Sequence, residues 1–229
     1  MSWKTLLAQA HASLDEKYQK FLKEDKEYFP SKEQYLNAFK TLPKHKVKYI
    51  LFGQDPYPRK ESASGYAFID TKVKTLFSPR GLSKEVNKAT SLRNFIKMLL
   101  VADKSLKKDQ SQEAISKLDK STYINSIEDL RKNFEKNGVL LLNTALIFTD
   151  KQSSNKHSKA WRPFMQTLVQ GLGRENPTLI LFGNEAKALK KHLCLEKFQS
   201  IELEHPYNHS FITNEKALKL FTDMRLLEL

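Results

Sequence analysis

The 229-residue chain contains little cysteine and little glycine, and it lacks any long apolar run. Its single cysteine, Cys194, allows no disulfide within the chain and no zinc site built from two or more cysteines. No apolar run approaches the roughly 18 residues that a membrane-spanning helix needs. Residues 1–15 have no apolar core of the signal-peptide type. These absences predict a soluble, cytoplasmic protein. Cys194 lies between Leu193 and Leu195 and is expected in the core.

The scarcity of glycine also argues against one class of α/β enzyme. The chain has seven glycines, and no Gly-rich phosphate loop follows any of the predicted strands. A nucleotide-binding α/β enzyme is therefore disfavoured.

Four short apolar segments are each followed by a polar residue. The segments are typical of buried parallel strands and span residues 47–52, 138–142, 178–182 and 200–204. The polar residues that follow them are, in order, Asp55, Asn143, Asn184 and His205. The carboxyl ends of parallel strands lie at one edge of a sheet, where open α/β sheets bind ligands. The pattern predicts a site with an acid, an amide and an imidazole.

The segments between the strands show helical spacing of apolar residues. Helices are predicted over residues 3–28, 35–39, 91–106, 161–172, 186–193 and 215–227. A short strand is predicted over 65–69, and the lysine-rich segment 103–122 is expected to be a polar surface insertion. Alternating strands and helices predict a parallel sheet with helices on both faces. A single domain over residues 1–229 is expected.

Basic residues outnumber acidic ones. The chain has 39 Lys and Arg against 26 Asp and Glu, a formal net charge of +13 and a pI near 9.6. This balance favours a polyanionic partner; the alternative explanation is an organism whose proteins are generally rich in lysine. Several basic residues, such as Arg59 and Lys60, follow the predicted strands, so a phosphate backbone is the favoured partner.

The segment Gly53-Gln54-Asp55-Pro56-Tyr57-Pro58 is the strongest single motif. Both prolines have a fixed φ and no N–H group, so the chain cannot continue the strand and forms a rigid loop. Asp55 and Tyr57 are thereby held at the end of the strand. A plain Asp-Pro turn is the alternative interpretation.

Three motifs together resemble family 1 uracil-DNA glycosylases. Gly-Gln-Asp-Pro-Tyr at 53–57, Leu-Leu-Leu-Asn-Thr at 140–144 and His-Pro at 205–206 occur in the order and at roughly the spacing of that family. The resemblance covers nearly the whole chain. It implies a three-layer α/β/α sandwich with a central four-stranded parallel sheet. It also implies hydrolysis of the N-glycosidic bond of deoxyuridine in DNA, without a metal or cofactor, as the start of base-excision repair.

The resemblance implies a role for each matching residue. Asp55 and His205 would be catalytic: the carboxylate would activate the attacking water, and the imidazole would donate to uracil O2. The uracil-binding residues would be Gln54, Tyr57, Phe68 and Asn143. Among these, Tyr57 would exclude the thymine methyl group, Phe68 would stack on the base, and the Asn143 amide would bond O4 and N3–H.

The residues expected to contact DNA lie mostly in loops where this sequence differs from the family pattern. They are assigned to Ser91, Asn184, Tyr207, His209 and Ser210. Pro58 stands where the family has a histidine, and His209 stands in place of the leucine that fills the vacated base stack. Since apolar wedges hold DNA unstacked, the change at His209 predicts a stronger preference for single-stranded or mismatched uracil.

The expected partner is uracil-containing DNA, single- or double-stranded, and no membrane. A monomer is expected, and a protein inhibitor that mimics DNA is a further candidate partner. One alternative function is a catalytically weak family member that serves as a DNA-binding or replication-accessory module. Another is an enzyme of the same fold acting on a different deaminated base, although Tyr57 and Asn143 favour uracil.

Overall fold

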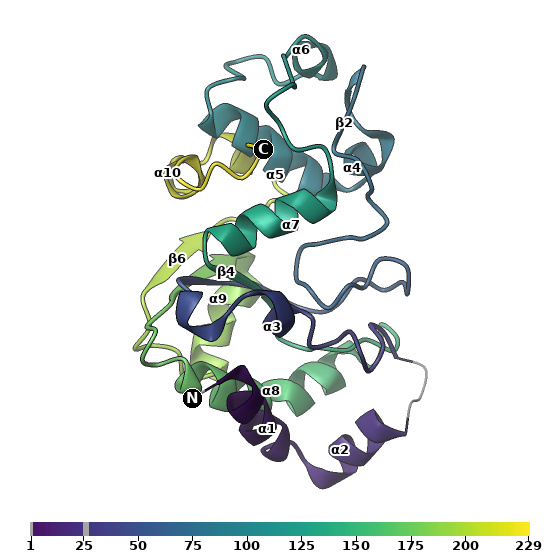
Figure 1. Cartoon of the computed structure of the whole chain (residues 1–229), viewed down its shortest axis with the longest axis vertical. Helices are drawn as coiled ribbons and strands as arrows, with labels where there is room; N and C mark the ends of the chain where they lie inside the picture. Colours follow the sequence, from purple (N-terminus) through teal and green to yellow (C-terminus); the bar gives the residue numbers. More distant parts are fainter. Residues whose placement is uncertain (1, 25–27) are drawn as a thin grey trace. The chain divides into compact units, whose positions relative to one another are not determined.

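The computed structural model describes residues 2–24 and 28–229, which form two compact units. Unit 1 contains the described residues up to Ile69 together with Gly138–Glu202, and unit 2 contains Asp70–Asn137 and Leu203–Leu229. Figure 1 traces the chain through both units. The expectation of one domain over residues 1–229 stays a prediction.

A four-stranded sheet carries the main site residues. Its strand order is β4 (Val139–Asn143), β1 (Tyr49–Gly53), β5 (Thr178–Phe182) and β6 (Ser200–Leu203). Strand β1 runs parallel to β4 and β5, and its Leu51 lies opposite Leu141 and Ile180. Strand β4 is buried along its whole length, as expected of a continuous apolar run covered on both faces. The predicted parallel sheet is confirmed; β5 matches its predicted range, and the bounds of β1, β4 and β6 differ from prediction by one or two residues.

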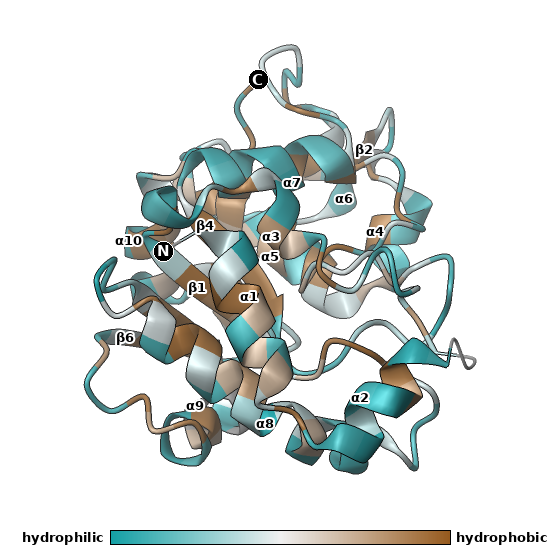
Figure 2. Cartoon of the chain, turned by 60° about the horizontal axis from the view of Figure 1, so that its bottom comes forward, coloured by the Kyte–Doolittle hydropathy of each residue, from teal (hydrophilic) through white to brown (hydrophobic). Residues whose placement is uncertain are grey.

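The helices of unit 1 flank this sheet. They are α1 (Trp3–Ala12), α2 (Glu16–Lys23), α3 (Ala38–Thr41), α8 (Ser154–Gly171) and α9 (Gly183–His192), with a 3-10 turn η1 (Lys44–Lys46). Helix α1 packs against α8 (Figure 1), where a Cβ on Gly171 would collide with the Leu6 side chain. Trp161 on α8 is fully buried. Figure 2 shows the apolar colour concentrated in β1 and on one side of α1.

The helix predicted over residues 3–28 is wrong in its extent. The chain forms α1 and α2 with a break between them, and residues 25–27 lie outside the described chain. The break occurs because the Asp15 carboxylate accepts from the N–H groups of Lys17 and Tyr18 and so caps a new helix. Apolar spacing continues across the break, which is why periodicity alone predicts one helix.

Unit 2 is built around α5 (Thr90–Ala102). Its other helices are α4 (Lys84–Lys88), α6 (Gln112–Ser116), α7 (Ile127–Lys136) and α10 (Glu215–Thr222), with a 3-10 turn η2 (His209–Thr213) and a small antiparallel pair, β2 (Phe77–Ser78) and β3 (Gly81–Leu82). Phe95 of α5 contacts the rings of Phe134, Phe211 and Phe221 at 5.8, 6.2 and 5.0 Å. This aromatic cluster holds α5, α7, η2 and α10 together.

Several local predictions are also wrong. Residues 65–69 form turns and no strand, and the predicted helix over 35–39 is mostly turns that lead into α3. The segment 103–122 is less open than expected, because it contains α6 with a fully buried Ile115. Cys194 is exposed rather than in the core. Within residues 2–24 and 28–229, no helix is long and apolar enough to cross a membrane.

Candidate active site

The loop after β1 is fixed against the residues that follow β4. The N–H groups of Thr144 and Ala145 donate to the carbonyls of Gly53 and Gln54 at 2.9 and 3.0 Å, and the Thr144 hydroxyl also donates to Gln54 O at 2.9 Å. The loop that carries Asp55 is therefore held beside the carboxyl end of β4. This arrangement agrees with the predicted convergence for the residues that follow β1 and β4.

Asn143 ends β4 directly opposite Gly53 of β1. Its side chain is only 5% exposed, and a Cβ on residue 53 would collide with its Oδ1 atom. Glycine at position 53 lets the amide pass this close to the backbone, and any larger residue would displace it. The amide of Asn143 is thus positioned by two neighbouring strands.

Phe68 is held in a strained conformation near the same strand ends. Its φ angle is 67°, a left-handed value that is costly for a bulky side chain. The preceding residue, Ala67, donates its N–H to Leu141 O of β4 at 3.1 Å. The half-buried Phe68 ring lies 6.2 Å from that of Phe182. Such strain clusters at ligand sites, which favours a binding role for Phe68 over a core role.

Asp55 has an asymmetric environment. The Ser154 hydroxyl donates to Oδ2 through a very short hydrogen bond. The Oδ1 atom is buried and has no hydrogen-bond partner in the described part of the chain. Burial raises the pKa of the Asp55 carboxyl above its ordinary value, and the bond from Ser154 opposes that rise. One oxygen is therefore fixed by the protein, and the other can accept a further bond.

Ser154 is a candidate site residue that the sequence analysis missed. It opens α8 and lies 99 residues from Asp55 along the chain. The adjacent Ser153 bonds instead to Asp150, through its N–H at 2.9 Å and its hydroxyl at 2.8 Å. A serine pair after an aspartate indicates a helix start, but nothing in that pattern shows which hydroxyl reaches Asp55.

The remaining predicted residues of unit 1 lie at the same strand ends. Tyr57 is half-buried, and Gln54 is exposed in the loop after β1. Asn184 is exposed at the start of α9, directly after β5. Unit 1 thus brings together the carboxylate, the amide and the two aromatic side chains that the sequence singles out.

In unit 2, His205 follows β6 and has a defined protonation pattern. The Tyr207 N–H donates to its Nδ1 atom at 3.0 Å, so the neutral ring carries its proton on Nε2. Desolvation lowers the pKa of His205 below its ordinary value, although the side chain keeps contact with solvent. At neutral pH the residue is an uncharged N–H donor.

The other predicted DNA contacts lie around the loop that His205 begins. The buried amide of Asn94 on α5 donates to the carbonyls of Pro206, Tyr207 and Asn208 at 2.8, 3.2 and 3.3 Å. Ser91 lies three residues earlier, on the same face of α5. Tyr207 is 67% exposed, and His209 and Ser210 are also exposed.

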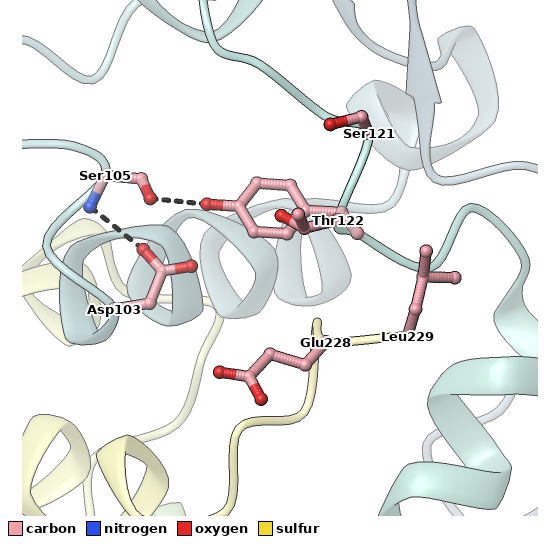
Figure 3. A pocket seen from close by; sticks show the side chains of 7 residues that line it. Asp103, Ser105, Ser121, Thr122, Glu228 and Leu229 are labelled. Atoms are coloured by element: carbon pink, nitrogen blue, oxygen red, sulfur yellow. Dashed lines mark hydrogen bonds between the residues drawn. The ribbon is translucent and has the colours of Figure 1, made fainter.

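A separate pocket of about 570 Å³ lies in unit 2 (Figure 3). It is lined by Asp103, Ser105, Ser121, Thr122, Tyr123, Glu228 and Leu229. None of the predicted site residues lines it, and the Tyr123 and Ser105 hydroxyls bond to each other. The described residues contain no group of three or more His, Cys, Asp or Glu side chains placed to hold a metal ion.

Comparisons with known protein families and with individual proteins agree on one family. The model of the uracil DNA glycosylase superfamily matches residues 39–225. The uracil-DNA glycosylase of Fusobacterium nucleatum is 32% identical over 85% of this chain and 71% of its own length. That of Mesomycoplasma hyopneumoniae is 28% identical over 91% of this chain and 80% of its own.

Solved structures agree with the sequence relatives. The crystal structure of UNG from Nitratifractor salsuginis is 52% identical, with a TM-score of 0.95 over 99% of this chain and 91% of that one. Mimivirus uracil-DNA glycosylase, 20% identical, shares the fold with a TM-score of 0.57 over 89% of this chain and 67% of that one. These likenesses confirm the predicted fold class. The chain belongs to the uracil-DNA glycosylase superfamily.

Proposed function

We propose that this protein hydrolyses the N-glycosidic bond of deoxyuridine in DNA, releasing uracil and leaving an abasic site for base-excision repair. The observation that carries the proposal is the convergence of three groups at the carboxyl ends of β1 and β4. These are the half-buried Asp55 carboxylate, the buried Asn143 amide and the ring of Phe68, whose backbone is strained. They supply an anion, a hydrogen-bonding edge and a stacking surface, which base excision requires.

Asn143 accounts for the choice of base. Its NH₂ group can donate to uracil O4 while its oxygen accepts from N3–H, whereas cytosine offers an amine and a bare lone pair at these positions. A site built on such bonds rejects a mismatched analogue strongly, because its buried polar groups stay unpaired. Tyr57, held between two prolines, is the rigid wall that we assign to exclusion of the thymine methyl group. Phe68 contributes stacking worth about 1–3 kcal/mol.

Asp55 and His205 account for the chemistry. Loss of uracil leaves positive charge on the sugar and negative charge on the base. The Asp55 carboxylate can stabilise the first charge, and its Oδ1 atom can accept a bond from the attacking water. His205 donates through Nε2–H to uracil O2 as charge builds there, and its neutral state is supported by its lowered pKa. No step requires a metal or cofactor.

The DNA-contacting residues are also part of the proposal. Ser91, Asn184, Tyr207, His209 and Ser210 are assigned to the DNA backbone and the base stack; all five keep solvent contact. Preference for single-stranded or mismatched uracil, a monomeric state, a cytoplasmic location and inhibition by a protein DNA mimic stay predictions of the sequence.

Base release from three matched oligonucleotides tests the proposed function. Each carries uracil, thymine or cytosine at one position, and is supplied single-stranded or paired. We expect release from the uracil substrate alone. Salt-sensitive DNA binding without release would instead support the accessory-module alternative, with Pro58 and His209 as the first residues to revert.

Replacing Ser154 by alanine should weaken catalysis and shift its pH dependence. The Ser154 bond opposes the rise in the Asp55 pKa, so its loss raises that pKa further. Because the ionised carboxylate is the active form, the acidic limb of the rate profile should move to higher pH. A hydrogen bond to a charged group contributes about 1.5–3 kcal/mol, so the neutral-pH rate should fall by about tenfold or more.

Ser153→Ala is the matched control for Ser154→Ala, because Ser153 bonds Asp150 and not Asp55. It should leave the acidic limb in place. An unshifted limb in Ser154→Ala would show that the Ser154 bond does not tune Asp55.

DNA affinity should fall steeply as salt rises. A net charge of +13 favours a phosphate-dominated interface, whose counterions are released on binding. Fluorescence anisotropy between 50 and 200 mM salt, on the order of the range over which such interfaces respond, should give a strongly negative log–log slope. A nearly flat plot would contradict the phosphate-backbone interpretation.

A further inference from the structure

The Glu204 carboxylate accepts hydrogen bonds from three side chains of the loop that follows it. The Ser210 hydroxyl donates to its Oε2 atom at 2.5 Å and the Asn208 amide to the same oxygen at 3.4 Å. The Asn214 amide donates to Oε1 at 3.0 Å. Desolvation raises the pKa of Glu204, but these three bonds outweigh it and hold the pKa below its ordinary value. The carboxylate is therefore charged at neutral pH and has a donor on each oxygen.

The same segment is braced on its backbone side. Asn94 donates to three consecutive carbonyls, those of residues 206–208, and the Tyr207 N–H fixes the His205 ring. Glu204 thus ties the side chains while Asn94 ties the main chain. When an irregular segment without such hydrogen bonds becomes ordered, the loss of backbone conformational entropy costs about 1–2 kcal/mol of free energy per residue. The two braces leave Tyr207 protruding from a fixed loop.

A carboxylate at this position carries an electrostatic cost for the proposed function. The loop residues Tyr207, His209 and Ser210 are assigned to DNA, and a negative charge beside phosphates is repulsive. In a chain with 39 basic and 26 acidic residues, a neutral residue at position 204 would avoid the repulsion. The hydrogen bonds that Glu204 accepts from Asn208, Ser210 and Asn214 stabilise the loop and can offset this repulsion.

We propose that Glu204 is a positioning residue for this reaction. Its carboxylate preforms the loop over residues 205–214, so that the His205 Nε2–H and the exposed loop side chains meet DNA already arranged. A preformed loop lowers the ordering cost of binding. The inference rests on the proposed function and adds a specific residue to it.

Hydrogen exchange separates this role from a mere surface charge. Glu204→Ala should speed amide exchange in residues 205–214. Glu202→Ala is the matched control: it removes the same charge two residues earlier, from an exposed side chain that pairs with Lys190 at 3.3 Å, and should leave that loop unchanged. Exchange in α10 is followed as well, because Asn214 also caps that helix. Faster exchange confined to α10 would overturn the proposal.

Kinetics and DNA binding give the second test. Loss of a repulsive charge alone predicts tighter DNA binding and an unchanged rate in both alanine variants. Positioning predicts that Glu204→Ala slows single-turnover uracil release by about 10- to 100-fold, as expected for lost bonds to a charged group, without tighter binding. Glu204→Gln, which keeps one oxygen acceptor, should recover part of the rate.

The outcomes also separate this inference from the proposed function. If the wild-type protein releases no uracil, the proposed function fails, but exchange and DNA binding still decide whether Glu204 organises the loop. If Glu204→Ala matches Glu202→Ala in exchange, binding and rate, Glu204 is not a positioning residue. Thermal unfolding of each variant confirms that the comparison is made between folded proteins.

Discussion

Replacing Asp55 by asparagine should lower single-turnover uracil release by about 10³-fold or more, the range expected when a general base or a preorganised charge is removed. Asparagine has nearly the same shape but carries no charge, so it cannot stabilise the positive sugar or activate water. The Ser154 hydroxyl can still bond to it, which keeps the loop in place. Quenched-flow sampling of a duplex with one uracil measures the effect.

The same variant should not be destabilised. Burial raises the pKa of Asp55 in the folded protein above its unfolded value. Its ionisation therefore costs folding stability, and this cost appears as pH rises from the unfolded to the folded pKa. Asp55→Asn removes the cost, so its melting temperature at neutral pH should equal or exceed that of the wild type. A rate within tenfold of the wild type would contradict the assigned role, and a lower melting temperature would contradict the account of its burial.

Replacing Asn143 by aspartate should change which base is released. The variant loses the NH₂ donor to uracil O4, and unmade bonds to buried polar groups cost about 1–3 kcal/mol each. Uracil release should fall by about 10- to 100-fold on this basis. The new carboxylate can accept from the cytosine amine, so release of cytosine should become measurable. Parallel single-turnover assays with uracil and cytosine substrates give both rates.

Asn143→Ala is the control that separates a change of specificity from a simple loss. It removes the amide without supplying an acceptor, so uracil release should fall with no gain on cytosine. Equal cytosine release by the alanine and aspartate variants would show that the Asn143 side chain does not read the base edge.

The sheet could be predicted from sequence because three of its strands, β1, β4 and β5, are short and largely buried apolar runs. Strand β5 matches its predicted range of 178–182, and β1 and β4 end at the motifs that punctuate them. The break between α1 and α2 could not be predicted from periodicity, because it depends on the Asp15 cap. The conformation of Phe68 could not be predicted either. Its segment forms turns in place of the predicted strand, and its positive φ angle is not indicated by the sequence pattern.

The candidate site could be predicted where its residues lie within local motifs. Asp55, Tyr57 and Asn143 each follow a strand that the pattern reveals. Ser154 and Glu204 could not be found in this way. Ser154 reaches Asp55 across 99 residues, and Glu204 bonds to residues four, six and ten positions further along the chain. Contacts of this kind depend on the folded path of the chain, which local spacing does not specify.

The most direct measurement is release of the free base from a duplex with a single uracil, identified by mass, with EDTA in the buffer. We predict release of uracil in single-turnover conditions, and no release from matched thymine or cytosine duplexes. Salt-sensitive DNA binding by a folded protein with no free uracil formed would contradict the central claim.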